Sequence, residues 1–212
     1  MLKAVVVTLI LLSGLAMGQT PPAQRKVINA GSISFPSNIK YFELSPDESE
    51  LLLVRETEVM IMGQAGGNYL LSKRNFTFDD PVEYAHYAPD GNTILIVERN
   101  GKARIFQRSS SSTAFAQQHE ITAVTSVVNK TYAGAISDNL GLVAVGDGKS
   151  IKLFNLDLTS PSSSLNKSIN LDIPSAKFEK IFSLKFYQNY LVAQYRRNSS
   201  DSFAKFYDTD LS

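Results

Sequence analysis

A pattern that recurs along the chain limits what it can fold into. Each copy has an apolar or aromatic segment, a Pro-Asp or Ser-Asp turn, four consecutive apolar residues, a polar turn and an alternating segment that ends in an aromatic residue or Met. The aspartates of the first three turns, Asp47, Asp90 and Asp138, are separated by 43 and 48 residues. A period in this range indicates repeated units of four antiparallel strands, each too small to bury its apolar faces alone.

Dipeptides that end in glycine lie where the strands of a unit must reverse. Asp90-Gly91, Asn100-Gly101 and Asp147-Gly148 supply the positive backbone angles that short hairpins require. We therefore expect structural turns at Asp47, Asp90, Gly91, Asp138, Asp147 and Gly148.

The four-residue apolar runs predict strands that are buried on both faces. They cover residues 51–54, 94–97, 142–145 and 190–193. Consecutive side chains of a strand point to opposite sides, so each of these strands needs a cover on both sides. A sheet packed between two other sheets provides that environment.

Short strand-like segments between the copies complete a four-stranded unit. They begin at Asn68, Ala114 and Asn166, and a further segment, 26–35, precedes the first copy. The predicted fold is all-β, an array of about four four-stranded antiparallel blades like those of a β-propeller. Within a repeat region of 26–212, the expected units span 36–74, 82–121, 131–171 and 181–210.

The units resemble those of the WD-repeat family of β-propellers. The resemblance covers residues 26–210 and rests on SPDE, APDG and ISDN before the apolar strands, and on RIF and KLF at the end of the alternating segments. The chain departs from the family pattern because it has no Trp and no Gly-His pair, and only FYD at 206–208 approaches the Trp-Asp ending. The resemblance implies that the turn aspartates cap backbone amides and that segment 26–35 acts as the closing strand of the last blade.

Four units leave three assemblies open. They are a closed four-bladed ring, half of an eight-bladed ring made by a homodimer, and a truncated part of a longer propeller. A start on a fourth strand and an end on a third strand favour a whole number of units, although a cut at any repeat boundary would give the same pattern.

The N-terminus has the pattern of a secretory signal peptide. Lys3 precedes an uncharged, mostly apolar run, and small residues precede Gln19. Polar residues and prolines from Gln19 onward interrupt the run before the roughly 20 residues that a membrane span needs. We expect residues 1–18 to be a cleaved signal peptide, residues 19–25 to be a linker, and the mature chain to be secreted or in the secretory-pathway lumen without a membrane span.

Composition argues against several kinds of partner and chemistry. Without residues 1–18 the chain has 20 basic and 20 acidic residues, so it lacks the basic excess that nucleic acid requires. It has no cysteine and only two histidines, His86 and His119, which argues against zinc, thiol chemistry and cofactors. A chain without disulfides must be held together by core burial.

The two histidines are interpreted as structural residues. His86 lies four residues before Asp90, but Asp47 and Asp138 are assigned to the same turn position without a nearby histidine, so these aspartates are expected to serve the turn. His119 is expected to face solvent on an outer strand.

Acids near the predicted turns could gather on one rim, but a metal is not expected there. Glu56, Glu58 and Glu98 lack the spacing of a calcium-binding loop. Arginines occupy corresponding positions at Arg55, Arg99, Arg196 and Arg197. We therefore expect mixed, self-compensating charge on this rim.

Four sequons fit a secreted glycoprotein, at Asn75, Asn129, Asn166 and Asn198. All but Asn166 are expected in loops on one face, which leaves the face with the SPDE and APDG turns for partners. The Ser-rich loops of that face can equally be flexible solvated segments.

These observations favour a secreted, non-catalytic scaffold that binds a protein or glycan partner through a propeller face, alone or as a homodimer. A propeller hydrolase of the lactonase kind is the alternative from another class. A truncated fragment without a function of its own is the third.

Overall fold

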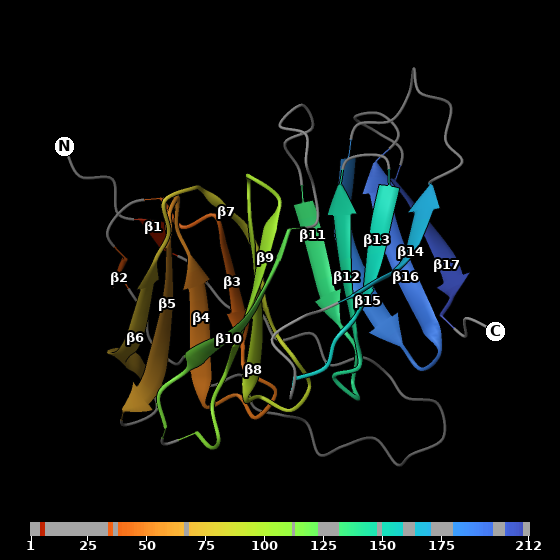
Figure 1. Cartoon of the computed structure of the whole chain (residues 1–212). Coiled ribbons are helices and arrows are strands. Elements are labelled where there is room, and N and C mark those ends of the chain that lie inside the picture. The colour runs from red at the N-terminus through yellow and green to blue at the C-terminus, as the bar shows by residue number, and fades with distance from the viewer. Residues whose placement is uncertain are drawn as a thin grey trace, which may run out of the picture.

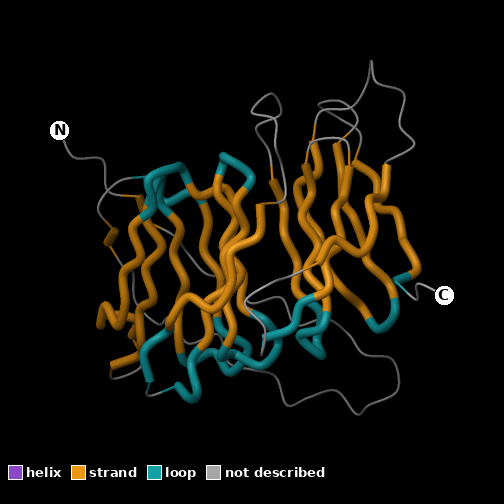
Figure 2. The backbone as a smooth tube through the Cα atoms, in the orientation of Figure 1, coloured by secondary structure: helices purple, strands orange, loops and turns teal. Residues whose placement is uncertain are grey.

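The computed structural model describes residues 5–6, 34–35, 38–65, 68–111, 113–122, 132–147, 150–158, 164–170, 180–196 and 202–209. These residues form strands joined by loops and turns, as Figure 2 shows. The all-β prediction is therefore confirmed. In this part of the chain there is no helix long and apolar enough to cross a membrane.

Four antiparallel sheets follow one another along the chain (Figure 1). The first sheet contains β3 (Tyr41–Leu44), β4 (Glu50–Val54), β5 (Glu58–Ala65) and β6 (Asn68–Thr77). The second contains β7 (Val82–Tyr87), β8 (Thr93–Glu98), β9 (Lys102–Gln107) and β10 (Ala116–Thr122). The third contains β11 (Tyr132–Ile136), β12 (Leu142–Asp147), β13 (Ser150–Asn155) and β14 (Ser164–Asn170). The fourth contains three described strands, β15 (Lys180–Tyr187), β16 (Tyr190–Arg196) and β17 (Ser202–Asp208).

A separate two-stranded pairing joins β1 (Val5–Val6) to β2 (Ser34–Phe35). β2 is the described end of the expected closing strand, and residues 26–33 lie outside the described residues. The expected linker and all of the expected signal peptide except β1 also lie outside them.

Apolar clusters join each sheet to the next. One cluster lies between the first and second sheets around Leu52 and Ile94, and another lies between the second and third around Leu95 and Val143. A third joins the third sheet to the fourth around Leu153. The first strands of successive sheets also contact one another, β3 with β7, β7 with β11 and β11 with β15. Among the described strands no such packing joins the first sheet to the fourth, and these sheets lie at opposite ends of the molecule in Figure 1.

The apolar runs are buried on both faces in the first two sheets but not in the last. β4 and β8 are buried at every residue. In β16, Leu191 and Ala193 are fully buried, whereas Tyr190 is 45% exposed and Val192 is half-buried. The prediction for 190–193 was therefore wrong, because no described sheet covers the second side of β16.

One turn geometry recurs between the first and second strands of the first three sheets. Its fourth residue has a positive φ, 58° at Glu48, 64° at Gly91 and 57° at Leu140. The backbone N–H of this residue donates to the carbonyl of the turn's first residue, at 2.8, 3.0 and 2.9 Å respectively. These turns lie along the lower edge of the molecule in Figure 2, which we call the turn face together with the β9–β10 loop, residues 108–115.

The third residue of each turn accepts hydrogen bonds through its side-chain oxygen. Asp47 accepts from the Ser45 hydroxyl at 2.6 Å and the Ser49 amide at 3.1 Å. Asp90 accepts from the Asn92 and Thr93 amides at 3.0 and 2.9 Å.

In the third sheet this place belongs to Asn139 and not to Asp138. The Asn139 side chain accepts from the Ser137 hydroxyl at 2.7 Å and from the Gly141 amide at 3.0 Å. Ser137 therefore aligns with Ser45, and Asp138 falls one residue too early in the turn to act as its cap.

The remaining predicted turns lie between the second and third strands. Gly101, with a φ of 84°, follows Asn100 between β8 and β9, and the Lys102 amide donates to the Asn100 side chain at 2.9 Å. Asp147 ends β12, and Gly148 lies outside the described residues.

Asp47→Asn is expected to make the free energy of unfolding change less between neutral and acid pH. Hydrogen bonds from Ser45 and then Ser49 hold the pKa of Asp47 below its ordinary value. A depressed carboxyl pKa stabilises the fold above the unfolded-state pKa, and this contribution is lost as pH falls through the folded-state pKa. Because Asp47 is exposed, the substitution should lower the free energy of unfolding by about 0.5 to 1 kcal/mol at neutral pH.

Urea unfolding near neutrality and near pH 3 checks this expectation, since the difference from wild type should become smaller as pH falls. Asp138→Asn is the matched control and should have no comparable effect. A difference that is the same at both pH values would contradict the assigned role of the Asp47 carboxylate.

Candidate functional site

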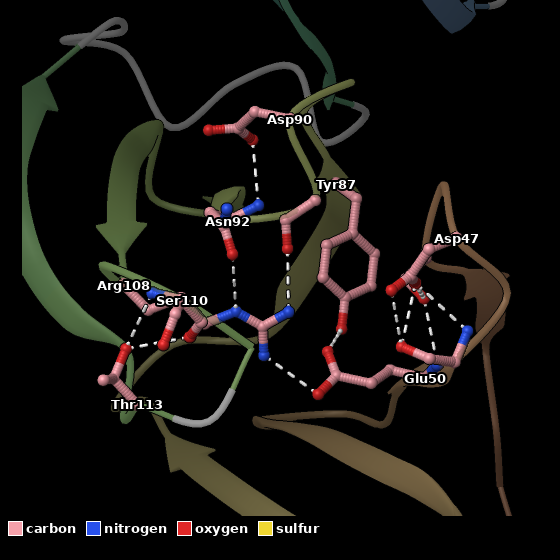
Figure 3. A network of polar contacts seen from close by, with 11 residues as sticks. Asp47, Glu50, Tyr87, Asp90, Asn92, Arg108, Ser110 and Thr113 are labelled. Carbon is pink, nitrogen blue, oxygen red and sulfur yellow. Dashed lines mark hydrogen bonds and ion pairs between the residues drawn. The ribbon is translucent and has the colours of Figure 1, made fainter.

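A buried ion pair joins the first two sheets beneath the turn face. Glu50 begins β4 and its side chain is 0% exposed, and Arg108 follows β9 and is 4% exposed. The Arg108 Nη1 donates to Glu50 Oε1 at 2.9 Å. Figure 3 shows the guanidinium between the carboxylate and the turn of the second sheet.

Neighbouring groups occupy the remaining polar positions of this pair. The Tyr87 hydroxyl donates to Glu50 Oε2 at 3.1 Å. Arg108 Nη2 donates to the Gly91 carbonyl at 2.9 Å, and its Nε donates to Asn92 Oδ1 at 3.2 Å. Burial, and then the Glu50 charge, raise the pKa of Tyr87, so its hydroxyl remains a donor at neutral pH.

An aromatic ring completes the enclosure of the guanidinium. The Arg108 Cζ lies 4.4 Å from the centre of the Phe115 ring. A desolvated cation over an aromatic face is stabilised by the ring quadrupole. The two ends of the β9–β10 loop therefore contact each other through the guanidinium and the ring.

The other repeat units do not have charged residues at the positions of Glu50 and Arg108. By alignment of the turns, Glu50 corresponds to Thr93 in the second sheet and Leu142 in the third. The Arg108 amide bonds the Asn92 carbonyl, and the Leu156 amide bonds the Gly141 carbonyl in the same way, both at 2.9 Å. Leu156 is thus the counterpart of Arg108. Because buried ion pairs often contribute little net stability over apolar side chains, this pair indicates a local specialisation.

A hollow of about 600 Å³ opens beside the ion pair on the turn face. Its polar lining includes Asp90, Asn92, Gln107, Ser109, Thr113 and Gln118. A second hollow of about 310 Å³ lies next to it and shares Arg108, Thr113 and Ala114 with the first. We call the larger one the turn-face hollow.

Hydrogen bonds within the β9–β10 loop hold one wall of this hollow. The Thr113 amide donates to the Ser110 carbonyl at 3.0 Å, and the Ser110 amide donates to Thr113 Oγ1 at 3.0 Å. The Ser109 hydroxyl donates to the same Thr113 oxygen at 3.2 Å. The described part of this Ser-rich loop therefore has defined local bonding.

The opposite rim carries paired charges. Glu83 lies 2.6 Å from Arg99 and 3.9 Å from Lys40, and Glu56 lies 3.1 Å from Lys40 and 3.7 Å from Arg99. These four groups belong to the first two sheets and compensate one another across their boundary.

The other predicted rim residues are paired locally or lie beyond the described set. Arg55 and Glu58 form an ion pair at 2.8 Å. Glu98 is 1% exposed and pairs with Arg104. The side chain of Arg196 and all of Arg197 lie outside the described residues.

Neither histidine lines the turn-face hollow, and the two lie on different strands of the second sheet, β7 and β10. His86 on β7 has Nδ1 2.7 Å from Glu43 Oε1 on β3, an ion-pair distance without hydrogen-bond alignment. His119 is only 3% exposed, so the prediction of a solvent-facing residue was wrong. Along β10 His119 lies on the same side as Ile121, which is 4% exposed and packs in the cluster between the second and third sheets.

The sequons are only partly within the described residues. Asn75 is exposed and lies within β6, not in a loop as expected, and Thr77 of the same sequon ends that strand. The backbone of Asn166 lies in β14. Asn129 and Asn198 lie outside the described residues.

The chemistry available at the turn-face hollow is hydrogen bonding. Side-chain amides, hydroxyls, one carboxylate and the Arg108 guanidinium line it, and the Asp90 carboxylate already accepts bonds from its own turn. No group of three metal-ligating side chains occurs among the described residues.

Sequence reasoning missed both Glu50 and Arg108. An alignment of the three turns would have given a signal for them. Glu50 is charged where the other units have Thr93 and Leu142, and Arg108 is charged where the third unit has Leu156.

Comparison with known proteins supports the architecture. No protein-family model matches the chain, and no curated protein matches it. A crystal structure of a protein from Lactobacillus plantarum has a TM-score of 0.61 and 15% identity, over 82% of this chain and 51% of that chain. The Cps50 (Swd1) β-propeller domain of Myceliophteria thermophila has a TM-score of 0.59 and 12% identity, over 84% of this chain and 60% of that chain.

These likenesses show the fold alone. The chain has the fold of a β-propeller, built from successive antiparallel sheets, and the propeller class is compatible with scaffold, interaction and hydrolase roles. The chain spans 51% and 60% of the two solved chains.

Proposed function

We propose that this chain is a divergent WD-like propeller that acts as a secreted, non-catalytic scaffold and binds a protein partner at the turn-face hollow. The observation that carries the proposal is the polar hollow beside the buried Glu50–Arg108 pair. The pair connects two sheets at a place where the repeat elsewhere uses uncharged side chains, so it maintains the local geometry of this hollow and not the general fold.

The lining favours an extended polypeptide segment as the ligand. Gln107, Asn92 and Gln118 each carry both donor and acceptor groups, which matches the alternating N–H and C=O groups of a peptide backbone. Hydrogen bonds already hold Arg108 and Asn92 beside the hollow, which reduces the conformational entropy lost on binding. The signal-peptide pattern supports a partner in the secretory pathway or outside the cell.

Photo-crosslinking identifies the partner and tests the site together. A benzophenone side chain is introduced at Gln118, which is exposed at the hollow, and in a separate chain at Glu56, which is 60% exposed on the opposite rim. Secreted material from the source cells is irradiated with each chain. We expect one protein to be crosslinked from Gln118 and not from Glu56.

Affinity of the identified protein for substituted chains then tests the assignment. Gln118→Arg should weaken binding at least about 10-fold, because it removes the side-chain amide and fills the hollow with a longer side chain, whereas Glu56→Arg should change it less than about 2-fold. Equal affinities for both variants would exclude the hollow. Loss of binding after enzymatic deglycosylation of the partner would identify a glycan and overturn the choice of a peptide.

A further inference from the structure

Exposed apolar surface is concentrated on one sheet. Among the described residues, the large apolar side chains that are exposed all belong to the fourth sheet: Phe182 (41%), Tyr187 (63%), Tyr190 (45%), Phe203 (40%) and Phe206 (65%). A contiguous exposed apolar patch on a water-soluble domain commonly marks an interaction surface.

Strand register places most of these side chains on one side of the sheet. Lys185, Val192 and Phe206 form one row across β15, β16 and β17, and Tyr187, Tyr190 and Asp208 form the next row. Paired residues of antiparallel strands share a face, and so do residues two apart along a strand. We call these six residues the outer face.

The other side of the sheet is packed against the third sheet. Leu184, Phe186, Leu191 and Ala193 are at most 6% exposed and join the cluster around Leu153. In the same way, the first and second sheets are each covered by the sheet that follows them. The outer face is therefore a sheet-packing surface that no described sheet covers.

The first sheet of another copy does not offer a matching surface. On the side of the first sheet that faces away from the second, Leu51, Leu53 and Met62 form a cluster and are 6%, 1% and 9% exposed. These side chains are already buried within their own chain, so they offer little exposed apolar area to the outer face of another copy. The surface that remains exposed on a second copy is its own outer face.

We propose that two copies of this chain pack the outer faces of their fourth sheets together about a two-fold axis. This arrangement closes on itself, because the same patch is used by both copies. It does not depend on the function proposed for the turn-face hollow.

Charge placement supports this pairing. Lys185 lies on β15 and Asp208 on β17, at opposite sides of the outer face, with Tyr190 and Val192 on the strand between them. With the axis parallel to β16, β15 of one copy lies over β17 of the second copy. Lys185 then lies over Phe206 of the second copy, one row from Asp208, and its long side chain reaches toward that carboxylate. The symmetric contact occurs once more.

Sedimentation velocity of the full chain over a range of concentrations tests the assembly. We expect a dimer whose dissociation constant rises at least about 10-fold with Phe206→Lys, because the introduced ammonium would lie over Lys185 of the second copy. Phe203→Lys is the matched control on the same strand, since Phe203 pairs with Tyr195 on the opposite side of the sheet. It should change the dissociation constant less than about 2-fold. A chain that stays monomeric throughout would overturn the proposal.

A mixing experiment tests the arrangement of the two copies. Chains with Lys185→Asp or with Asp208→Lys should each dimerise about 10-fold more weakly than wild type, because like charges would meet across the axis. An equimolar mixture of the two variants should recover dimerisation, since both charge pairs become complementary only between unlike chains. A mixture no tighter than its components would contradict the proposed contact, even if the wild-type chain is dimeric.

Discussion

Glu50→Ala is expected to lower the free energy of unfolding by about 3 to 5 kcal/mol. The substitution leaves the Arg108 guanidinium, which is 4% exposed, buried without its carboxylate. It also removes the acceptor of the Tyr87 hydroxyl. An uncompensated buried cation costs far more than the loss of one hydrogen bond.

Urea unfolding measures this effect, and Glu56→Ala is the control because Glu56 is 60% exposed in its ion pairs. The control should cost less than about 1 kcal/mol. Similar losses of stability for the two variants would show that burial of the Glu50–Arg108 pair does not determine the size of the effect.

The double variant with Glu50→Leu and Arg108→Leu separates stability from recognition. Leu142 and Leu156 stand at the corresponding places of the third sheet, so the apolar pair should regain most of the stability that Glu50→Ala loses. If the ion pair shapes the turn-face hollow, this stable chain should still bind the crosslinked partner at least about 10-fold more weakly than wild type. Unchanged binding would assign the pair to the fold alone.

Leu95→Ala is expected to lower the free energy of unfolding by about 2 to 5 kcal/mol. Leu95 is fully buried in the cluster that joins the second and third sheets. Its removal leaves a cavity where β8 faces β11. Urea or thermal unfolding of the purified variant gives the loss directly.

The same site allows a specific check through Gly134 on β11. A Cβ at Gly134 would lie 2.8 Å from Leu95 Cδ2 and 2.9 Å from Val97 Cγ2. Gly134→Ala alone should therefore cost about 1 to 3 kcal/mol by overpacking, and clearly less in the Leu95→Ala background. Strictly additive effects would contradict direct packing of these two positions.

Local signals were sufficient to predict the strands. The Asp-Gly and Asn-Gly dipeptides and the apolar runs depend on backbone angles and side-chain alternation within a few residues, so they identified the four sheets. The error at Asp138 arose because two neighbouring residues, Asp138 and Asn139, can both accept turn hydrogen bonds. Only the matching of Ser137 with Ser45 fixes which of them does so.

The candidate site could not be predicted from local pattern. Glu50 and Arg108 are 58 positions apart. Glu50 begins a strand and Arg108 directly follows one, which are places where charged residues are commonly exposed. Their burial results from the packing of two sheets. His119 was misplaced because its prediction rested on its place in an outer strand, whereas one side of that strand is buried and His119 shares this side with Ile121.

Each described sheet packs only against the sheets next to it, and this affects how the molecule unfolds. In such a linear stack, the free energy of each sheet depends on its own strands and its immediate neighbours, as in a one-dimensional array. The fourth sheet has one such neighbour among the described strands, whereas the second has two. Local unfolding can therefore begin at β15–β17 and stop before it reaches the boundary between the first and second sheets, where Glu50 and Arg108 pair. The fourth sheet can then unfold locally while the first two sheets of the same chain stay folded.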